Sequence, residues 1–131
     1  MNHDSPHPDP PERRRSILVV DDEPGIREIL SHWLASAGYE VSKAAGGQEA
    51  LDLIKSQGTP FDLVIIDMIM PDMAGPELME QITRLHRGTR SLYMTGHSNL
   101  FNLKNGRPQA HIIKPSTRQN LLQVVRDALA T

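Results

Sequence analysis

The sequence predicts an α/β domain in which one parallel sheet is covered by helices on both faces. Two observations support this prediction. Short apolar runs rich in β-branched residues recur along the chain, as in strands that are buried on both faces. Between these runs, apolar residues recur at helical spacing. Five expected strands alternate with five expected helices, and the sequence shows neither an internal repeat nor a second domain.

The expected strands are short apolar runs that end where polar residues begin. In chain order they are Ile17–Val20, Tyr39–Val41, Leu63–Ile66, Ser91–Met94 and His111–Ile113. The first and third are apolar throughout, as in the centre of a parallel sheet. The second is short and partly polar, as in an edge strand.

The expected helices follow the strands and are bounded by proline and glycine. The first is expected from Pro24 to a cap at Gly38, and the second from Gly46-Gly47 to residues 58–60. The third begins at about Pro76, and the fourth covers Asn99 to Lys104. The fifth carries the apolar residues from Leu121 to Leu129. The residues expected to face inward are Ile26, Ile29, Leu30, Trp33, Leu34, Ala37, Ala50, Leu51, Ile54, Leu78, Met79, Ile82, Leu85, Leu121, Leu122, Val125, Ala128 and Leu129.

Size and composition restrict the class of protein. The 131 residues suffice for one domain with a core, and the lack of cysteine excludes disulfides, thiolate metal sites and a cysteine nucleophile. Lysine and arginine total 14 against 16 acidic residues, so a broad nucleic-acid footprint is not expected. No apolar segment approaches the roughly 20 residues that span a bilayer, and the amino terminus lacks the apolar core of a secretion signal. We therefore expect a soluble cytoplasmic domain that binds neither membrane nor nucleic acid directly.

The first 15 residues are rich in proline and hold no large apolar side chain after Met1. Such a segment cannot bury enough surface to offset the entropy of ordering it. We therefore expect residues 1–15 to be a flexible tail and residues 16–131 to be the folded domain. The run Arg13–Arg15 is interpreted as a solvated lead-in to the first strand, with a nucleic-acid or membrane patch as the alternative.

Polar side chains follow four of the strands. Asp21 and Asp22 come after the first, Asp67 after the third, Thr95 after the fourth and Lys114 after the fifth. The carboxyl ends of parallel strands share one edge, where ligands of open α/β sheets bind, so these groups can converge. Taken singly, each is a strand cap or a surface charge; taken together, they indicate a site.

The charges at this edge favour a bound cation. Three carboxylates held close together repel one another, and a single lysine does not balance them. Oxygen ligands without histidine or cysteine suit Mg²⁺, with Mn²⁺ as the alternative. A carboxylate beside a hard cation, a hydroxyl and an ammonium can take a phosphoryl group, because carboxylates attack phosphorus to give aspartyl-phosphate.

Four motifs resemble, in order, those of the receiver domains of two-component response regulators. They are ILVVDDEP from Ile17 to Pro24, DMIMP from Asp67 to Pro71 with Gly75, Met94-Thr95-Gly96, and Ile113-Lys114-Pro115. The resemblance covers residues 16–131. It implies a flavodoxin-like, doubly wound fold with strand order 2-1-3-4-5 and five helices. It also implies a signalling switch that catalyses only its own phosphorylation and dephosphorylation.

The resemblance assigns roles to the acids. Asp67 would accept a phosphoryl group from a sensor histidine kinase or a phosphotransfer protein. Asp22 and Asp67 would ligate Mg²⁺ together with the backbone carbonyl of Ile69, and Asp21 would act mainly through water.

The resemblance also implies how the signal travels. Thr95 and Lys114 would bind the phosphoryl oxygens, and the bond from Lys114 to Pro115 is cis in the family. Movement of the threonine lets an aromatic side chain of the fifth strand turn inward, which remodels the face of the fourth helix, fifth strand and fifth helix. A downstream protein is expected to bind there, with the domain a monomer or weak dimer. The segment from Thr95 to Lys114 is short for the family, which predicts a stunted fourth helix.

One position departs from the family pattern at the switch, and two positions flank the phosphoryl site. His111 stands where the aromatic side chain is expected; it is either a weaker or pH-dependent switch, or a histidine with no switching role. Ile69 and His97 lie two residues after Asp67 and Thr95, where members of the family often carry polar side chains, and both are expected to set the lifetime of the phosphoryl group. The apolar Ile69 cannot orient an attacking water, so we expect a long-lived aspartyl-phosphate.

Three alternatives are considered. An enzyme of haloacid-dehalogenase type also uses a strand-end aspartate and Mg²⁺, but it needs a second acid where Ile69 stands. A flavodoxin-like cofactor binder would need phosphate-binding donors after the first strand, where Asp21-Asp22-Glu23 would repel the ligand. The third is a receiver-like interaction module that is not phosphorylated. Because no output domain is visible, we expect a stand-alone receiver or a fragment, such as the receiver of a hybrid sensor kinase.

Overall fold

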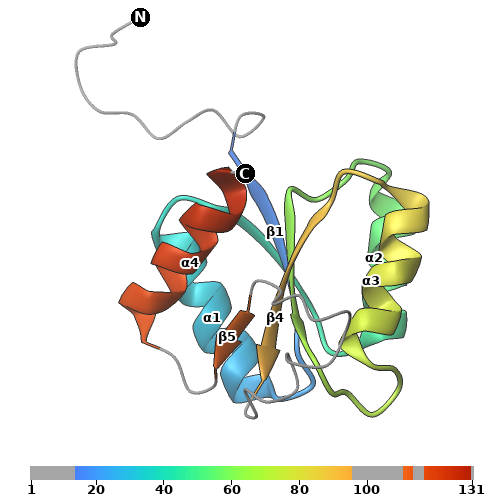
Figure 1. Cartoon of the computed structure of the whole chain (residues 1–131), viewed down its shortest axis with the longest axis horizontal. Coiled ribbons are helices and arrows are strands. Elements are labelled where there is room, and N and C mark those ends of the chain that lie inside the picture. Colours follow the sequence, from blue (N-terminus) through green and yellow to red (C-terminus); the bar gives the residue numbers. More distant parts are fainter. Residues whose placement is uncertain (1–13, 96–110, 114–116, 131) are drawn as a thin grey trace, which may run out of the picture.

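The computed structural model describes residues 14–95, 111–113 and 117–130. Its strands form one parallel sheet in the order β2-β1-β3-β4-β5 (Figure 1). The strands are β1 (Ser16–Val20), β2 (Glu40–Ala44), β3 (Leu63–Asp67), β4 (Arg90–Thr95) and β5 (His111–Ile113). The predicted parallel sheet and its strand order are confirmed.

The described residues form four helices, two on each face of the sheet. They are α1 (Pro24–Ser36), α2 (Gly47–Gln57), α3 (Gly75–Leu85) and α4 (Arg118–Ala130). Helices α1 and α4 cover one face, and α2 and α3 cover the other (Figure 1). The predicted helix at residues 99–104 and nearly all of the predicted tail lie outside the described residues. Within the described part of the chain, no helix is long and apolar enough to cross a membrane.

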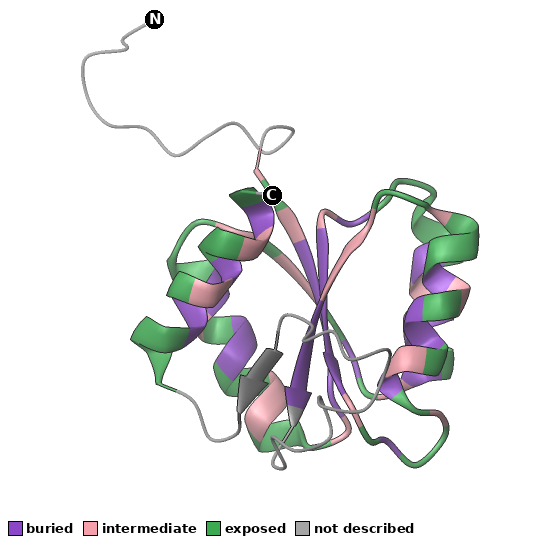
Figure 2. Cartoon of the chain, viewed as in Figure 1, coloured by how far each residue is buried: buried purple, intermediate pink, exposed green. Residues whose placement is uncertain are grey.

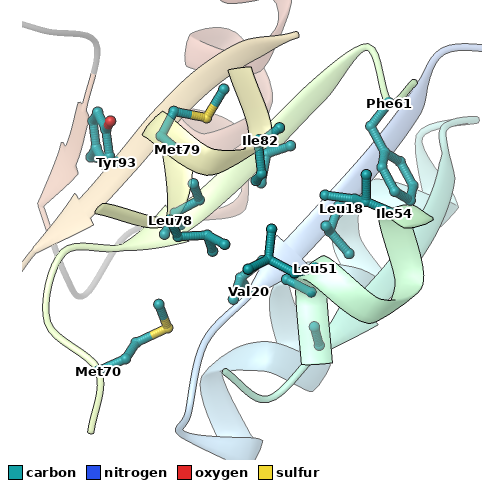
Figure 3. Packing of buried hydrophobic residues seen from close by; sticks show 14 residues of the cluster. Leu18, Val20, Leu51, Ile54, Phe61, Met70, Leu78, Met79, Ile82 and Tyr93 are labelled. Atoms are coloured by element: carbon teal, nitrogen blue, oxygen red, sulfur yellow. The ribbon is translucent and has the colours of Figure 1, made fainter. Parts of the chain in front are cut away.

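The two central strands, β1 and β3, are buried on both faces (Figure 2). Their consecutive side chains therefore enter two different cores. The core beneath α2 and α3, shown in Figure 3, takes Leu18, Val20, Val64 and Ile66. The core beneath α1 and α4 takes Ile17, Val19, Leu63 and Ile65. Burial of each side chain of this size contributes roughly 1.5–3 kcal/mol to the free energy of folding. The two strands therefore hold the residues at their carboxyl ends in fixed positions.

Strand β2 lies at the edge of the sheet, as predicted, but it is longer than the predicted residues 39–41. It runs from Glu40 to Ala44 and stays paired with β1 over its whole length. Gly38 and Gly58 follow α1 and α2 with φ of 100° and 82°, so both helices end in the left-handed region that glycine tolerates.

Three residues expected to face inward do not. Ile29 and Leu85 are each 44% exposed, and Ala37 is exposed too. The buried face of α1 is centred on Leu30 and Leu34, four residues apart, which leaves Ile29 on its flank. Ala37 is the C-cap residue of α1, and Leu85 is the last residue of α3.

Candidate functional site

The carboxyl ends of β1 and β3 lie next to each other. The two strands pair in register up to Val20 and Ile66. Asp21 comes directly after β1, and Asp67 is the last residue of β3. Asp21 stays tied to the sheet, because its amide donates to the Ala44 carbonyl at 3.1 Å. The sheet therefore brings both aspartates to one edge.

Three carboxylates meet at this edge. Asp21, Asp22 and Asp67 each offer an oxygen that lies within 4.8 Å of the others. Asp21 is fully buried and Asp67 is 7% exposed, whereas Asp22 is half-buried. The structure thus brings together the three acids that the strand ends predicted.

Neighbouring donors orient these aspartates. The Glu23 amide donates to Oδ1 of Asp21 at 2.9 Å, and the Ile69 amide donates to Oδ1 of Asp67 at 3.4 Å. Nη1 of Arg27, in α1, donates to the main-chain carbonyl of Asp21 at 2.8 Å. The guanidinium therefore holds the main chain that carries the acid.

The carboxylate cluster fits a hard divalent cation. Mg²⁺ binds oxygen in an octahedron at about 2.0–2.1 Å, which places two of its ligands about 3 to 4 Å apart. The 4.8 Å limit on the three acids is close to that spacing. All the donors are carboxylate oxygens, the chemistry that Mg²⁺ and Mn²⁺ prefer. Two of the side chains are buried, where their mutual repulsion is little screened by solvent.

The loop from β3 to α3 packs tightly against the strand end. The Gly75 amide donates to the Met68 carbonyl at 2.9 Å, and a β-carbon at Gly75 would lie 2.6 Å from the Asp67 carbonyl oxygen. Ile69 has a side chain that is 63% exposed, although its amide contacts Asp67. The Ile69 side chain therefore lies in solvent at the rim of the site, while its main-chain amide contacts the Asp67 carboxylate.

The other predicted site residues follow β4 and β5. Thr95 ends β4 and pairs with Ile113 of β5, so the main chain of both strand ends reaches the acidic edge. The side chains of Thr95 and His111, and the whole of His97 and Lys114, lie outside the described part of the chain. Their predicted roles stay predictions.

Tyr93 is the residue of β4 that pairs with His111. It is 5% exposed, and this burial raises the pKa of its hydroxyl, with a smaller opposing effect from a hydrogen bond with Ser91. The phenol therefore stays neutral, and an aromatic ring already occupies the strand beside the predicted switch position.

Two residues around the site were not predicted, Arg27 and Asp72. Asp72 lies in the β3–α3 loop, and its carboxylate accepts from the Gly47 and Gln48 amides at the start of α2. From the sequence it was given no role. The signal that could have identified it is the pair Gly46-Gly47, which opens a helix without any side chain able to cap it.

Comparison with known proteins decides the family. The family model for the response regulator receiver domain matches residues 17–126. The chain belongs to the response regulator receiver family. The resemblance found in the motifs is therefore confirmed.

The receiver domain is similar to proteins of different lengths. The sensor kinase CckA of Brucella abortus is 30% identical over 87% of this chain, which spans 12% of CckA. The sporulation initiation phosphotransferase F of Bacillus subtilis is 31% identical over 86% of this chain and 89% of that protein. The crystal structure of the response regulator protein TrrA from Thermotoga maritima, in complex with Mg²⁺-BeF, has a TM-score of 0.74 and 33% identity. The match covers 87% of this chain and 98% of TrrA.

Proposed function

We propose that this receiver domain is a phosphorylation-activated signalling switch. Asp67 accepts a phosphoryl group from the phosphohistidine of a sensor histidine kinase or a phosphotransfer protein. The observation that carries this proposal is the meeting of the Asp21, Asp22 and Asp67 carboxylates within 4.8 Å at the ends of β1 and β3. The domain catalyses only its own phosphorylation and dephosphorylation.

The chemistry is one displacement at phosphorus. A carboxylate oxygen of Asp67 forms a bond to phosphorus while the phosphorus–nitrogen bond of the donor breaks, and the imidazole of the donor leaves. The Ile69 amide keeps the Asp67 carboxylate in one orientation. Asp22, Asp67 and the Ile69 carbonyl would hold Mg²⁺, or Mn²⁺ in its place, with Asp21 acting through water. The bound cation supplies neutralisation of the negative charge on the phosphoryl oxygens.

The switch depends on new contacts to the phosphoryl group. Thr95 and Lys114 would bind its oxygens, at roughly 1.5–3 kcal/mol for each hydrogen bond to a charged group. Inverting a two-state equilibrium from 1:99 to 99:1 needs about 5.5 kcal/mol, which two such contacts nearly supply. The change would reach a downstream protein through His111 of β5 and the face made with residues 99–104 and α4. The domain would act as a monomer or weak dimer.

A mass measurement tests the chemistry. The protein is incubated with acetyl phosphate and Mg²⁺, with and without EDTA, and its intact mass is determined. We expect a gain of one phosphoryl group that requires the metal and is absent in Asp67→Asn. Asp62→Asn serves as the control, because the Asp62 carboxylate accepts a hydrogen bond from the Ser16 amide at the amino ends of the strands, away from the acid cluster. A gain in mass that persists in Asp67→Asn, or that is the same with and without EDTA, would overturn the proposal.

A further inference from the structure

Asp72 joins the β3–α3 loop to the start of α2. Its Oδ1 accepts from the Gly47 amide at 3.2 Å, and its Oδ2 accepts from the Gln48 amide at 3.0 Å. The first amides of a helix have no partner within the helix, and the N-cap residue here is Gly46, which has no side chain to offer. A carboxylate from a distant loop therefore caps α2.

The contact is close because glycines occupy both the N-cap and the first position of α2. A β-carbon at Gly46 would lie 3.1 Å from Oδ1 of Asp72, and one at Gly47 would overlap the Met73 side chain. The two ends of the same loop are joined by the hydrogen bond from the Gly75 amide to the Met68 carbonyl, next to the end of β3. The loop is thus held at the sheet on one side and at α2 on the other, with Ile69 between the two attachments.

We propose that Asp72 is a positioning residue for the phosphoryl-acceptor site, because it holds the β3–α3 loop against α2 and so keeps the Ile69 main chain beside Asp67. This inference rests on the proposed function, in which the Ile69 carbonyl is a metal ligand. Asp72 itself is exposed, and it acts through Ile69, three residues before it, rather than on the metal. The two amide hydrogen bonds lower the pKa of Asp72, so its carboxylate is ionised and accepts both bonds at neutral pH.

The test is the affinity for Mg²⁺ alone, measured by calorimetric titration of the wild type, Asp72→Ala, Asp72→Asn and Asp52→Ala. Asp52 is a matched control, since it is an exposed acid of α2 that accepts from the Gln48 side chain. Loss of a group that orients a metal ligand raises the dissociation constant by about tenfold or more, which is the result expected for Asp72→Ala. Asp72→Asn should fall between, because its carbonyl oxygen still accepts one bond. Asp52→Ala should leave the constant unchanged.

Two further readouts separate positioning from simple destabilisation. In metal-free protein, the NMR signals of the Asp67 and Ile69 amides should move in Asp72→Ala and stay in place in Asp52→Ala. At saturating Mg²⁺, the rate of modification by acetyl phosphate in Asp72→Ala should return to that of the wild type. A lower free energy of unfolding with unchanged Mg²⁺ affinity would make Asp72 a helix cap only and would overturn the inference. A wild type that binds no Mg²⁺ would instead overturn the proposed function.

Discussion

A β-carbon at Gly75 would lie 2.6 Å from the carbonyl oxygen of Asp67. The obstacle is main chain rather than a flexible side chain, so Gly75→Ala must push the start of α3 away from the end of β3. Overpacking of this kind costs about 1–3 kcal/mol, which we expect as a loss in the free energy of unfolding in urea. Modification of Asp67 by acetyl phosphate should slow as well, because the strand end that carries the acid is displaced.

Gly25 provides the control for this substitution. It is the second residue of α1, and a β-carbon added there meets nothing within 4 Å. Alanine is favoured over glycine inside a helix by roughly 0.5–1 kcal/mol, so Gly25→Ala should leave the protein equally or more stable. Equal losses in the two variants would show that the contact between Gly75 and Asp67 has no special role.

Ile69 is expected to prolong the life of the aspartyl-phosphate. Its side chain is 63% exposed at the rim of the acid cluster and offers no polar atom to orient an attacking water. Ile69→Asn introduces such an atom, so the phosphoryl group should be lost faster, as followed by intact mass after removal of acetyl phosphate. Ile69→Leu, which stays apolar, should decay like the wild type. Unchanged or slower decay in Ile69→Asn would contradict the prediction.

The stabilisation of α2 by the Asp72 carboxylate should depend on pH. The Gln48 and Gly47 amides lower its pKa from the ordinary value of 3.8. A group with a lowered folded-state pKa contributes stability that is complete above its unfolded pKa and is lost as the pH falls through the folded value. The difference in unfolding free energy between wild type and Asp72→Ala should therefore be largest at neutral pH, at about 1 kcal/mol, as for other helix caps. It should shrink below a pH of about 4, where the free carboxyl group titrates.

Urea unfolding at a series of pH values checks this prediction. The same series on Asp52→Ala gives the background, because that exposed acid accepts only from a side chain. A difference between wild type and Asp72→Ala that stays constant from neutral to acidic pH would mean that the charge of Asp72 does not stabilise α2.

The acid cluster could be predicted because the carboxyl ends of parallel strands lie at the same edge of the sheet, so residues that follow different strands come close together. An apolar run that stops at a charge marks both a buried strand and the edge where its side chains gather, as at Asp21 and Asp67. Asp72 could not be found in this way, since its partners lie 24 and 25 residues earlier, at the start of helix α2. Ile29 was misplaced for another reason. Helical periodicity identifies the buried side of a helix, but it does not resolve the flank of that side.

The ion pair between Lys43 and Glu28 is expected to contribute little. Nζ of Lys43 lies 2.9 Å from Oε1 of Glu28, and this hydrogen bond lowers the pKa of the Glu28 carboxyl. The two side chains are 45% and 58% exposed, and solvent-exposed pairs contribute little because water and salt screen their charges. Lys43→Ala should therefore change the urea midpoint only slightly, and less in high salt than in low salt. A large loss would mean that the pair has a role in joining α1 to β2 beyond its charges.

Lys114 should matter for the response rather than for folding or for modification. In the proposed switch, Thr95 and Lys114 together would nearly supply the 5.5 kcal/mol that a full inversion requires, at roughly 1.5–3 kcal/mol each. With one contact removed, the remaining bias would be roughly ten- to a hundredfold instead of about ten-thousandfold, so only about a tenth to a half of the molecules would switch. Lys114→Ala should thus keep the urea midpoint of the wild type and still gain one phosphoryl group at Asp67.

The response itself can be followed in α4, which packs against β4 and β5 and holds Val125 in the core. On modification, the NMR signals of the α4 amides should move in the wild type and in the control Lys55→Ala, whose lysine is exposed on α2. They should move less in Lys114→Ala, because a smaller fraction of the molecules switches. If that variant is modified and its α4 signals move as in the wild type, Lys114 does not transmit the signal, and Thr95 alone must supply the difference between the two states.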